Sequence, residues 1–217
     1  MPTPPPTAAP TDDELAERAK QGELGAFNAL VGRYQRPVFG LCLRMLSSPP
    51  AAEDAAQDAF VSAWRGIGGY RGGSFQAWML RIAGNQCRDE LRKRKRRPTD
   101  SLDSMLEAGG DSVAPPSRER SPEGRAMGAE TASVIQQGLA TLPPEQRQAI
   151  LLSDVHGLPY DEIAQAMGTS VGTVKSRISR GRARLRSFLT ARGELPGGRG
   201  RQAEHGAPSA PAARSPS

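Results

Sequence analysis

The sequence has few of the residues from which metal sites, disulfides and catalytic centres are built. It contains two cysteines, Cys42 and Cys87, and two histidines, His156 and His205, among 217 residues. The cysteines are too few and too far apart for a zinc site or a disulfide framework, so we expect both to be reduced and buried. No glycine-rich phosphate-binding loop has the required spacing. We therefore expect neither an enzyme nor a bound cofactor or metal.

Long hydrophobic runs are also missing. No uninterrupted apolar stretch approaches the roughly 20 residues that cross a bilayer. The first residues, MPTPPPTAAPTDDEL, lack the basic start and the apolar core of a signal peptide. No segment alternates convincingly between polar and apolar residues, so β-strands are not expected. We therefore expect a helical, cytoplasmic chain that does not itself span a membrane.

Positive charge is what the sequence has in excess. Lysine and arginine number 29 against 23 aspartate and glutamate, which gives a net charge of +6 and a pI near 9.9. This balance favours a polyanionic partner but does not identify one.

Helical periodicity is confined to two regions. We predict an all-α protein with two small helical domains, residues 12–97 and 130–189, joined by a flexible acidic linker at residues 98–129. The linker is rich in proline, glycine and serine and shows little periodicity. Residues 1–11 and 190–217 have similarly low complexity, and we expect both termini to be disordered.

The second helical region contains the pattern of a helix-turn-helix. A short amphipathic segment at residues 161–167 is followed by Gly168, which can adopt the left-handed conformation of a tight turn. Ser170 is then a good N-cap for a helix with basic and hydroxyl residues near its start. Such a helix fits the major groove of DNA. The alternative is a solvated basic helix that only confers solubility, and the turn and the cap together argue against it.

Aromatic residues, only 5% of the sequence, gather around a glycine-rich loop in the first region, and the basic run CRDELRKRKRR follows. Rings and cations beside a flexible loop suit unpaired nucleic acid, in which each stacked base contributes about 1–3 kcal/mol. We expect Trp64 and Trp78 to fill the domain core. Tyr70 and Arg71, next to glycines in the loop, are better placed to contact a ligand. The basic run alone suits a solvated helix end or a localisation-like patch.

An acidic strip is predicted on a helix of the same region, because its residues are spaced so that they share one face: Glu53, Asp54, Gln57 and Asp58. On a basic protein such a strip would suit a basic protein partner rather than DNA. An ordinary solvated face explains it equally well.

Two segments resemble the sigma-70 family of transcription initiation factors. AEDAAQDAFVSAWRGIGGYRGGSFQAWMLRIAGNQCRDELRKRKRR resembles domain two, and LPPEQRQAILLSDVHGLPYDEIAQAMGTSVGTVKSRISRGRARLRSFL resembles domain four. With only a linker between them, the chain is similar to the small extracytoplasmic-function (ECF) group. The resemblance implies a factor, not an enzyme, that binds core RNA polymerase and promoter DNA and is commonly held inactive by an anti-sigma factor.

The resemblance also implies which residues make these contacts. The acidic strip would bind the clamp helices of the largest polymerase subunit through Asp54, Gln57 and Asp58. The unpaired −10 element would be captured by Tyr70, Arg71, Gly72, Gly73, Ser74, Asn85 and Arg88. The −35 element would be read as duplex by Thr173, Lys175, Ser176, Arg177 and Arg180.

Two departures from the family pattern affect these implications. Pro159 stands where many relatives carry serine, so the helix after it loses a capping hydroxyl but gains a fixed start. Gly72 and Gly73 replace a more acidic pattern, which leaves the preferred −10 base open. The competing hypothesis is a stand-alone DNA-binding regulator whose first domain serves as a sensor or a dimerisation module.

Overall fold

The structure is a computed structural model that describes residues 9–96 and 122–193, with the backbone alone for residues 122–129. Every regular element in these ranges is helical, as the sequence predicts. The predicted disorder of residues 1–8 and 194–217, and the predicted linker up to residue 121, lie outside the described residues.

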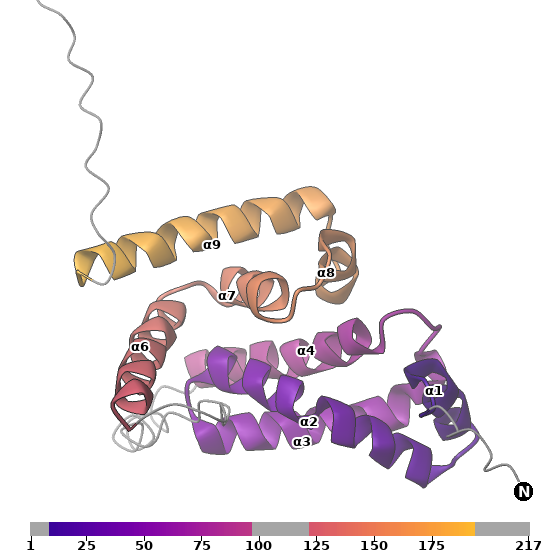
Figure 1. Cartoon of the computed structure of the whole chain (residues 1–217). Helices are drawn as coiled ribbons and strands as arrows, with labels where there is room; N and C mark the ends of the chain where they lie inside the picture. Colours follow the sequence, from indigo (N-terminus) through magenta and orange to yellow (C-terminus); the bar gives the residue numbers. More distant parts are fainter. Residues whose placement is uncertain (1–8, 97–121, 194–217) are drawn as a thin grey trace, which may run out of the picture.

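The N-terminal domain begins with helices whose ends are set by local sequence signals. Thr11 caps the first helix in a capping box, in which Thr11 Oγ1 accepts from the Glu14 amide at 3.2 Å and Glu14 Oε2 accepts from the Thr11 amide at 2.8 Å. Ser47, at φ 57°, ends the second helix, and Pro49 starts the third. The described elements are α1 (Asp12–Lys20), α2 (Leu24–Leu46), α3 (Pro49–Gly66), the 3-10 turn η1 (Ile67–Gly69) and α4 (Phe75–Arg96) (Figure 1).

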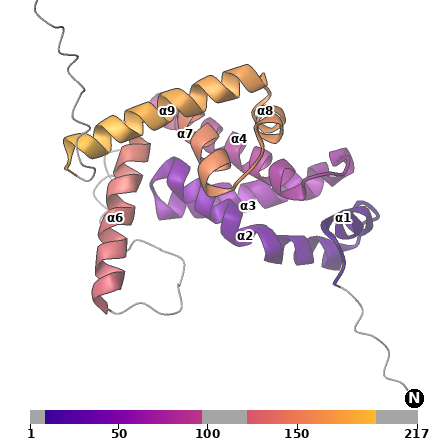
Figure 2. The same ribbon diagram turned by 45° about the horizontal axis from the view of Figure 1, so that its top comes forward.

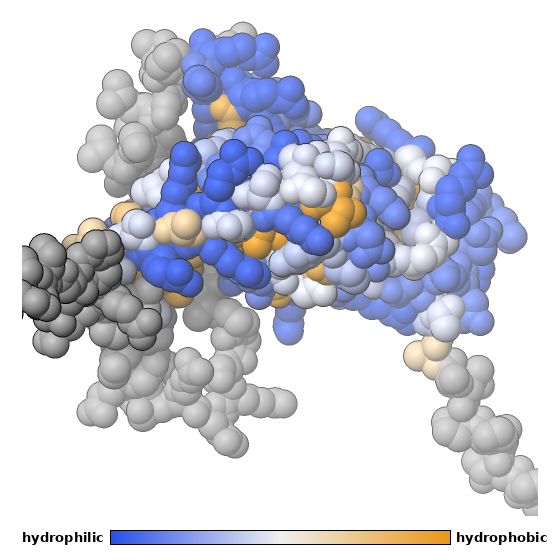
Figure 3. Space-filling model, turned by 90° about the horizontal axis from the view of Figure 1, so that it is seen from above, coloured by the Kyte–Doolittle hydropathy of each residue, from blue (hydrophilic) through white to orange (hydrophobic). Residues whose placement is uncertain are grey.

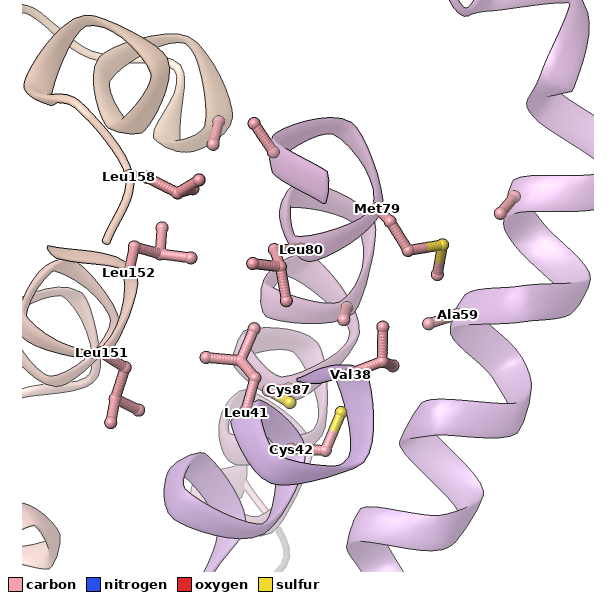
Figure 4. Packing of buried hydrophobic residues seen from close by; sticks show 14 of the residues in the cluster. Val38, Leu41, Cys42, Ala59, Met79, Leu80, Cys87, Leu151, Leu152 and Leu158 are labelled. Atoms are coloured by element: carbon pink, nitrogen blue, oxygen red, sulfur yellow. The ribbon is translucent and has the colours of Figure 1, made fainter. Parts of the chain in front are cut away.

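The core of this domain lies between α2, α3 and α4. The buried face of α3 is made of alanines, which allows close approach of the neighbouring helices. Val38 of α2 and Met79 of α4 point toward Ala59 of α3 (Figure 4). Cys42 and Cys87 are buried, free thiols of the same core, as the sequence predicts.

The C-terminal domain starts earlier than predicted. Its first helix begins at Pro122, inside the segment predicted as a linker, and proline is a residue favoured at the first position of a helix. The elements are α6 (Pro122–Ala140), α7 (Pro144–Ile150), the π-helical segment η3 (Leu151–Val155), α8 (Tyr160–Met167) and α9 (Val171–Ala191).

The two domains pack against each other. In Figures 1 and 2, α9 is outermost, α7 and α8 lie beneath it, and α4 and α2 follow. Leu152 and Leu158 point toward Leu80 of α4 in Figure 4, and one continuous buried cluster runs through both domains. We call the region where α6, α7 and α8 meet α2 and α4 the interdomain contact. Both predicted helical domains are therefore present, but in this structure they share a core.

Candidate nucleic-acid interface

The predicted helix-turn-helix is formed by α8 and α9. Gly168 ends α8 in the left-handed conformation, at φ 60° and ψ 45°. Ser170 caps α9, because its Oγ accepts a hydrogen bond from the Thr173 amide at 3.2 Å. Pro159 occupies the N-cap position of α8 and provides no side-chain cap. The turn and the cap therefore define where α9 begins.

Packing against α7 decides which face of α9 is exposed. Val174 and Ile178 are almost fully buried. Gly181 lies on the same side, where a Cβ atom would come within 2.6 Å of Ile150 Cδ1. Gly181 was not among the residues predicted from the sequence, although a glycine in the middle of an amphipathic helix is a signal of close helix approach. The side of α9 opposite these residues faces the solvent.

Two of the five residues predicted to read duplex DNA are fully exposed on α9. Lys175 and Arg180 are exposed, whereas Thr173, Ser176 and Arg177 are half-buried. The Arg180 guanidinium donates to Ser176 O at 3.2 Å and to Ser176 Oγ at 3.0 Å, so it lies along the helix toward the N-terminus of α9. Seen from the α9 side, hydrophilic residues cover most of the surface, with small apolar patches among them (Figure 3).

One cation of α9 has an internal role. Arg182 Nε and Nη2 donate to the two carboxylate oxygens of Asp154 at 3.0 and 2.6 Å. These bonds hold the pKa of Asp154 below its usual value, although burial acts in the opposite direction. Arg182 thus links α9 to η3.

In the loop after η1, the structure places Tyr70 differently from the sequence-based expectation. Tyr70 is only 2% exposed, and its ring packs against Phe75 and Trp78, with centroid distances of 5.3 and 5.6 Å. Its hydroxyl lies 2.6 Å from Asp13 Oδ1 and 2.8 Å from Gly73 O. Tyr70 therefore anchors the loop on α1, and in this structure no face of its ring is open to a base. Trp64 and Trp78, which were predicted to fill the core, are partly buried and pack against it.

The other predicted loop residues remain accessible. Arg71, Gly72 and Gly73 are exposed. Both glycines have positive φ, 87° and 88°, a backbone conformation that residues other than glycine rarely adopt. Ser74 Oγ accepts a hydrogen bond from the Ala77 amide at 3.1 Å, so this hydroxyl starts α4. Because the two glycines are exposed and have no side chains, a ligand can approach the backbone of this loop closely.

Asn85 and Arg88 lie one turn apart on α4 and are hydrogen-bonded to each other. Asn85 is exposed, but Arg88 Nε is buried and lacks a hydrogen-bond partner. Burial lowers the pKa of Arg88, and the nearby charge of Arg177 acts in the same direction, while Glu145 opposes it. Arg177 Nη1 is likewise buried without a partner. The two arginines, one from each predicted DNA-binding surface, are therefore close enough for their charges to interact.

The acidic strip on α3 is open. Its members are all exposed: Glu53, Asp54, Gln57 and Asp58. The main packing partners of α3 are α2, α4 and η1, all in its own domain. The C-terminal domain therefore leaves this surface free.

The interdomain contact contains polar residues that the sequence analysis missed. Arg147 is 6% exposed, and its guanidinium donates to Met45 O, to Ala140 O at 2.7 Å and to Leu142 O at 3.2 Å. Burial lowers the pKa of Arg147. Met45 and Ala140 lie in the last turns of α2 and α6, whose free carbonyl groups carry partial negative charge. The carbonyl groups at the ends of two helices, and no carboxylate, therefore accept the hydrogen bonds of the Arg147 guanidinium.

A second set of hydrogen bonds reaches the C-terminal end of α2. Gln136 Nε2, on α6, donates to Ser47 Oγ at 2.8 Å and to Arg44 O at 3.3 Å. Both acceptors lie at the C-terminus of α2. A residue of the C-terminal domain therefore caps this helix of the N-terminal domain.

Two further features, a cluster of metal-binding residues and a membrane-spanning helix, are not found in residues 9–96 and 122–193. These residues contain no group of three or more His, Cys, Asp or Glu arranged to hold a metal ion. None of the described helices is both long and apolar enough to cross a bilayer.

Burial, with the charge of Arg44 nearby, lowers the pKa of His156 to about 4, so its imidazole is neutral at pH 7.

Comparison with known proteins gives matches to both domains. The family model described as Sigma-70 region 2 matches residues 30–97, and the model described as Sigma-70, region 4 matches residues 133–185. The chain is 38% identical over 182 residues to the RNA polymerase sigma-H factor of Pseudomonas aeruginosa, which covers 82% of this chain and 93% of that protein. It is 38% identical over 174 residues to the ECF RNA polymerase sigma-E factor of Escherichia coli K12, which covers 79% and 91%.

Solved structures with a similar fold include two protein complexes. CnrH in complex with the cytosolic domain of CnrY gives a TM-score of 0.59 at 25% identity, covering 83% of this chain and 97% of that chain. The sigma factor RpoE in complex with the anti-sigma factor NepR, from Bartonella quintana, gives 0.59 at 26% identity, covering 76% and 96%.

Proposed function

The chain belongs to the extracytoplasmic-function group of the sigma-70 family of RNA polymerase sigma factors, and from this premise we propose how its surfaces divide the work of promoter recognition. Matches to both sigma regions, and 38% identity over 182 residues to a sigma-H factor, support promoter-directed transcription initiation as its function. The family and the fold class predicted from the sequence are confirmed.

The −35 element is read by the start of α9. The capped N-terminus places Lys175 and Arg180 on the solvent side, and this is the observation on which the proposal depends most. An arginine there can bind both acceptors of a guanine edge in the major groove. Thr173 and Ser176 share this end of the helix and supply hydroxyl groups that suit phosphate or base contacts.

The −10 element is held by the N-terminal domain. Arg71, Gly72 and Gly73 offer an exposed cation and an accessible backbone, and Asn85 is exposed on α4. Unpaired bases bind in such places because extrusion exposes their Watson–Crick edges. Ser74 and Tyr70 shape the loop rather than stack on bases, since the Tyr70 ring is buried.

Core RNA polymerase binds the acidic strip on α3 through Asp54, Gln57 and Asp58. The strip is exposed on a basic protein, which suits a basic protein surface better than DNA. We also propose regulation by an anti-sigma factor, because the similar RpoE structure from Bartonella quintana contains one. A chain that binds polymerase and promoter DNA acts in the cytoplasm. In this role it needs neither a catalytic residue nor a cofactor of its own.

Run-off transcription tests these assignments. A promoter is first selected from a random-sequence library with the wild-type holoenzyme. Asp58→Arg reverses the charge at the C-terminal end of the acidic strip, so we expect it to weaken polymerase binding by tenfold or more, about 1.4 kcal/mol, with a matching loss of transcripts.

Glu130→Arg makes the same charge change on α6 and serves as the control. Undiminished holoenzyme formation by Asp58→Arg would refute the role of the strip. No transcripts above core polymerase alone with the wild-type chain would instead favour a stand-alone DNA-binding regulator.

A further inference from the structure

We propose that α1 controls the capture of an unpaired −10 base through the hydrogen bond between Asp13 and the Tyr70 hydroxyl. Both are positioning residues for the loop at residues 70–74, and neither touches the base. The inference rests on the proposed function, because the same loop is proposed to hold the −10 element. It adds to the −10 site a helix that lies far from the loop in the sequence.

The Tyr70 side chain is held by α1 at two points. In the first turn of α1, Asp13 Oδ1 lies 2.6 Å from the Tyr70 hydroxyl. In the last turn, Lys20 Nζ lies 5.7 Å from the centroid of the Tyr70 ring. The helix also packs on η1, the turn that precedes the loop (Figure 1). Tyr70 is therefore the side chain through which α1 acts on the loop.

The position of Asp13 is itself fixed. The capping box of Thr11 sets the start of α1, and Asp13 is the second residue of this helix. The neighbouring Asp12 accepts hydrogen bonds from the Tyr34 hydroxyl and, at 2.6 Å, from Arg33 Nη1, both on α2. Because the first turn of α1 is fastened to α2, the bond to Asp13 ties Tyr70 to a fixed point of the domain.

The Tyr70 hydroxyl has two acceptors but only one proton. Besides Asp13 Oδ1, it faces the carbonyl oxygen of Gly73 at 2.8 Å. Burial, together with the hydrogen bond to Asp13, raises the pKa of Tyr70, so the hydroxyl keeps its proton at neutral pH. It can donate this proton to one acceptor at a time, and a carboxylate is the stronger acceptor of the two. Asp13 therefore draws the proton away from Gly73.

This competition matters because little else holds the middle of the loop. Among the described residues, the contact with the Tyr70 hydroxyl is the only hydrogen bond to residues 71–73. The two ends are bonded separately, Tyr70 N to Ile67 O at 3.0 Å and Ala77 N to Ser74 Oγ at 3.1 Å. The acceptor that receives the proton therefore decides how firmly the loop is ordered before DNA arrives.

The order of the loop affects both affinity and selectivity for a base. A loop that is already ordered loses less conformational entropy on binding and offers one fixed set of contacts. Two substitutions should therefore act in opposite directions. Tyr70→Phe removes both contacts of the hydroxyl and loosens the loop. Asp13→Asn replaces the carboxylate by a weaker acceptor, which releases the proton to Gly73 O and tightens the loop.

Amide nitrogen relaxation of Gly72 and Gly73 in the free full-length chain measures loop order without DNA or polymerase. The order parameters of both amides should fall in Tyr70→Phe and rise in Asp13→Asn, and the double variant should match Tyr70→Phe. Tyr34→Phe is the matched control, because it removes a tyrosine hydroxyl that is bonded to α1 but not to the loop. Equal loop order in Tyr70→Phe and Tyr34→Phe would overturn the proposal, as would an Asp13→Asn loop no more ordered than wild type.

Holoenzyme binding to promoter fragments with an unpaired −10 strand measures the consequence for base capture. The fragments carry each base in turn at every −10 position. In Tyr70→Phe, the ratio of affinities for the preferred and the next-best base should fall by about three- to tenfold, the range expected for the loss of one hydrogen bond. The ratio should rise in Asp13→Asn and stay at the wild-type value in Tyr34→Phe.

Arg71→Ala separates this inference from the proposed function, because Arg71 is exposed and is proposed to contact the −10 strand. Wild-type affinity and base preference in Arg71→Ala would count against the proposed function of the loop. Weaker binding by Arg71→Ala, with an unchanged base preference in both Tyr70→Phe and Asp13→Asn, would overturn the inference alone.

Discussion

Removal of the Arg147 guanidinium should destabilise the folded chain, because this group caps the C-terminal ends of two helices, α2 and α6. Arg147→Met keeps much of the apolar stem but leaves the carbonyl groups of Met45, Ala140 and Leu142 without their donor. A buried group left unpaired costs about 1–3 kcal/mol. Burial of the guanidinium is itself unfavourable, which offsets part of this loss. We expect the free energy of unfolding to fall by about 3 kcal/mol.

Urea unfolding followed by far-ultraviolet circular dichroism measures this change. Arg147→Lys retains a positive charge near the ends of α2 and α6 but lacks the planar fork that reaches several acceptors, so an intermediate loss is expected. Arg184→Met, at an exposed position of α9, is the control and should stay within about 0.5 kcal/mol of wild type. An Arg147→Met chain as stable as this control would refute the capping role of the guanidinium.

Two other predictions concern DNA specificity and pH. Arg180→Ala should weaken binding by about 1–3 kcal/mol at one −35 position and relax specificity there. Holoenzyme binding to a set of single-base promoter variants measures this change, with Arg184→Ala as the control. A uniform loss of affinity over all sequences would instead make Arg180 a phosphate contact. The pKa of His156 is lowered to about 4 in the folded chain, so the unfolded chain takes up this proton first as the pH falls. Stability should therefore be complete above about pH 6.5 and decline toward pH 4 by up to about 3 kcal/mol. A pH series of urea unfolding in which His156→Gln declines as steeply as wild type would contradict this.

Sequence reasoning succeeded where the deciding signals are local. Gly168 and Ser170 determine the turn of the helix-turn-helix within three residues, and the structure forms both as expected. The acidic strip follows from spacing along one helix. Pro122 was an available signal for the start of α6, but the composition of the surrounding segment concealed it.

Long-range partners could not be predicted in the same way. The hydroxyl of Tyr70 donates to Asp13, 57 residues away, and no local pattern indicates this partner. Arg147 and Gln148 are neighbouring polar residues of the short helix α7, and polar side chains are normally exposed to solvent, yet both are buried. Leu152 and Leu158 fit the core of their own domain equally well, so periodicity could not assign them to an interface between domains.

The separation between the acidic strip on α3 and the basic face of α9 has a genetic consequence under the proposed division of roles. A chain that loses DNA contacts but keeps the strip still occupies polymerase and withholds it from the intact protein, so alleles at Arg180 are dominant. Alleles at Asp58 leave polymerase to the wild-type copy and are recessive. In a partial diploid, the dominance of a mutation therefore reports which of the two surfaces it damages.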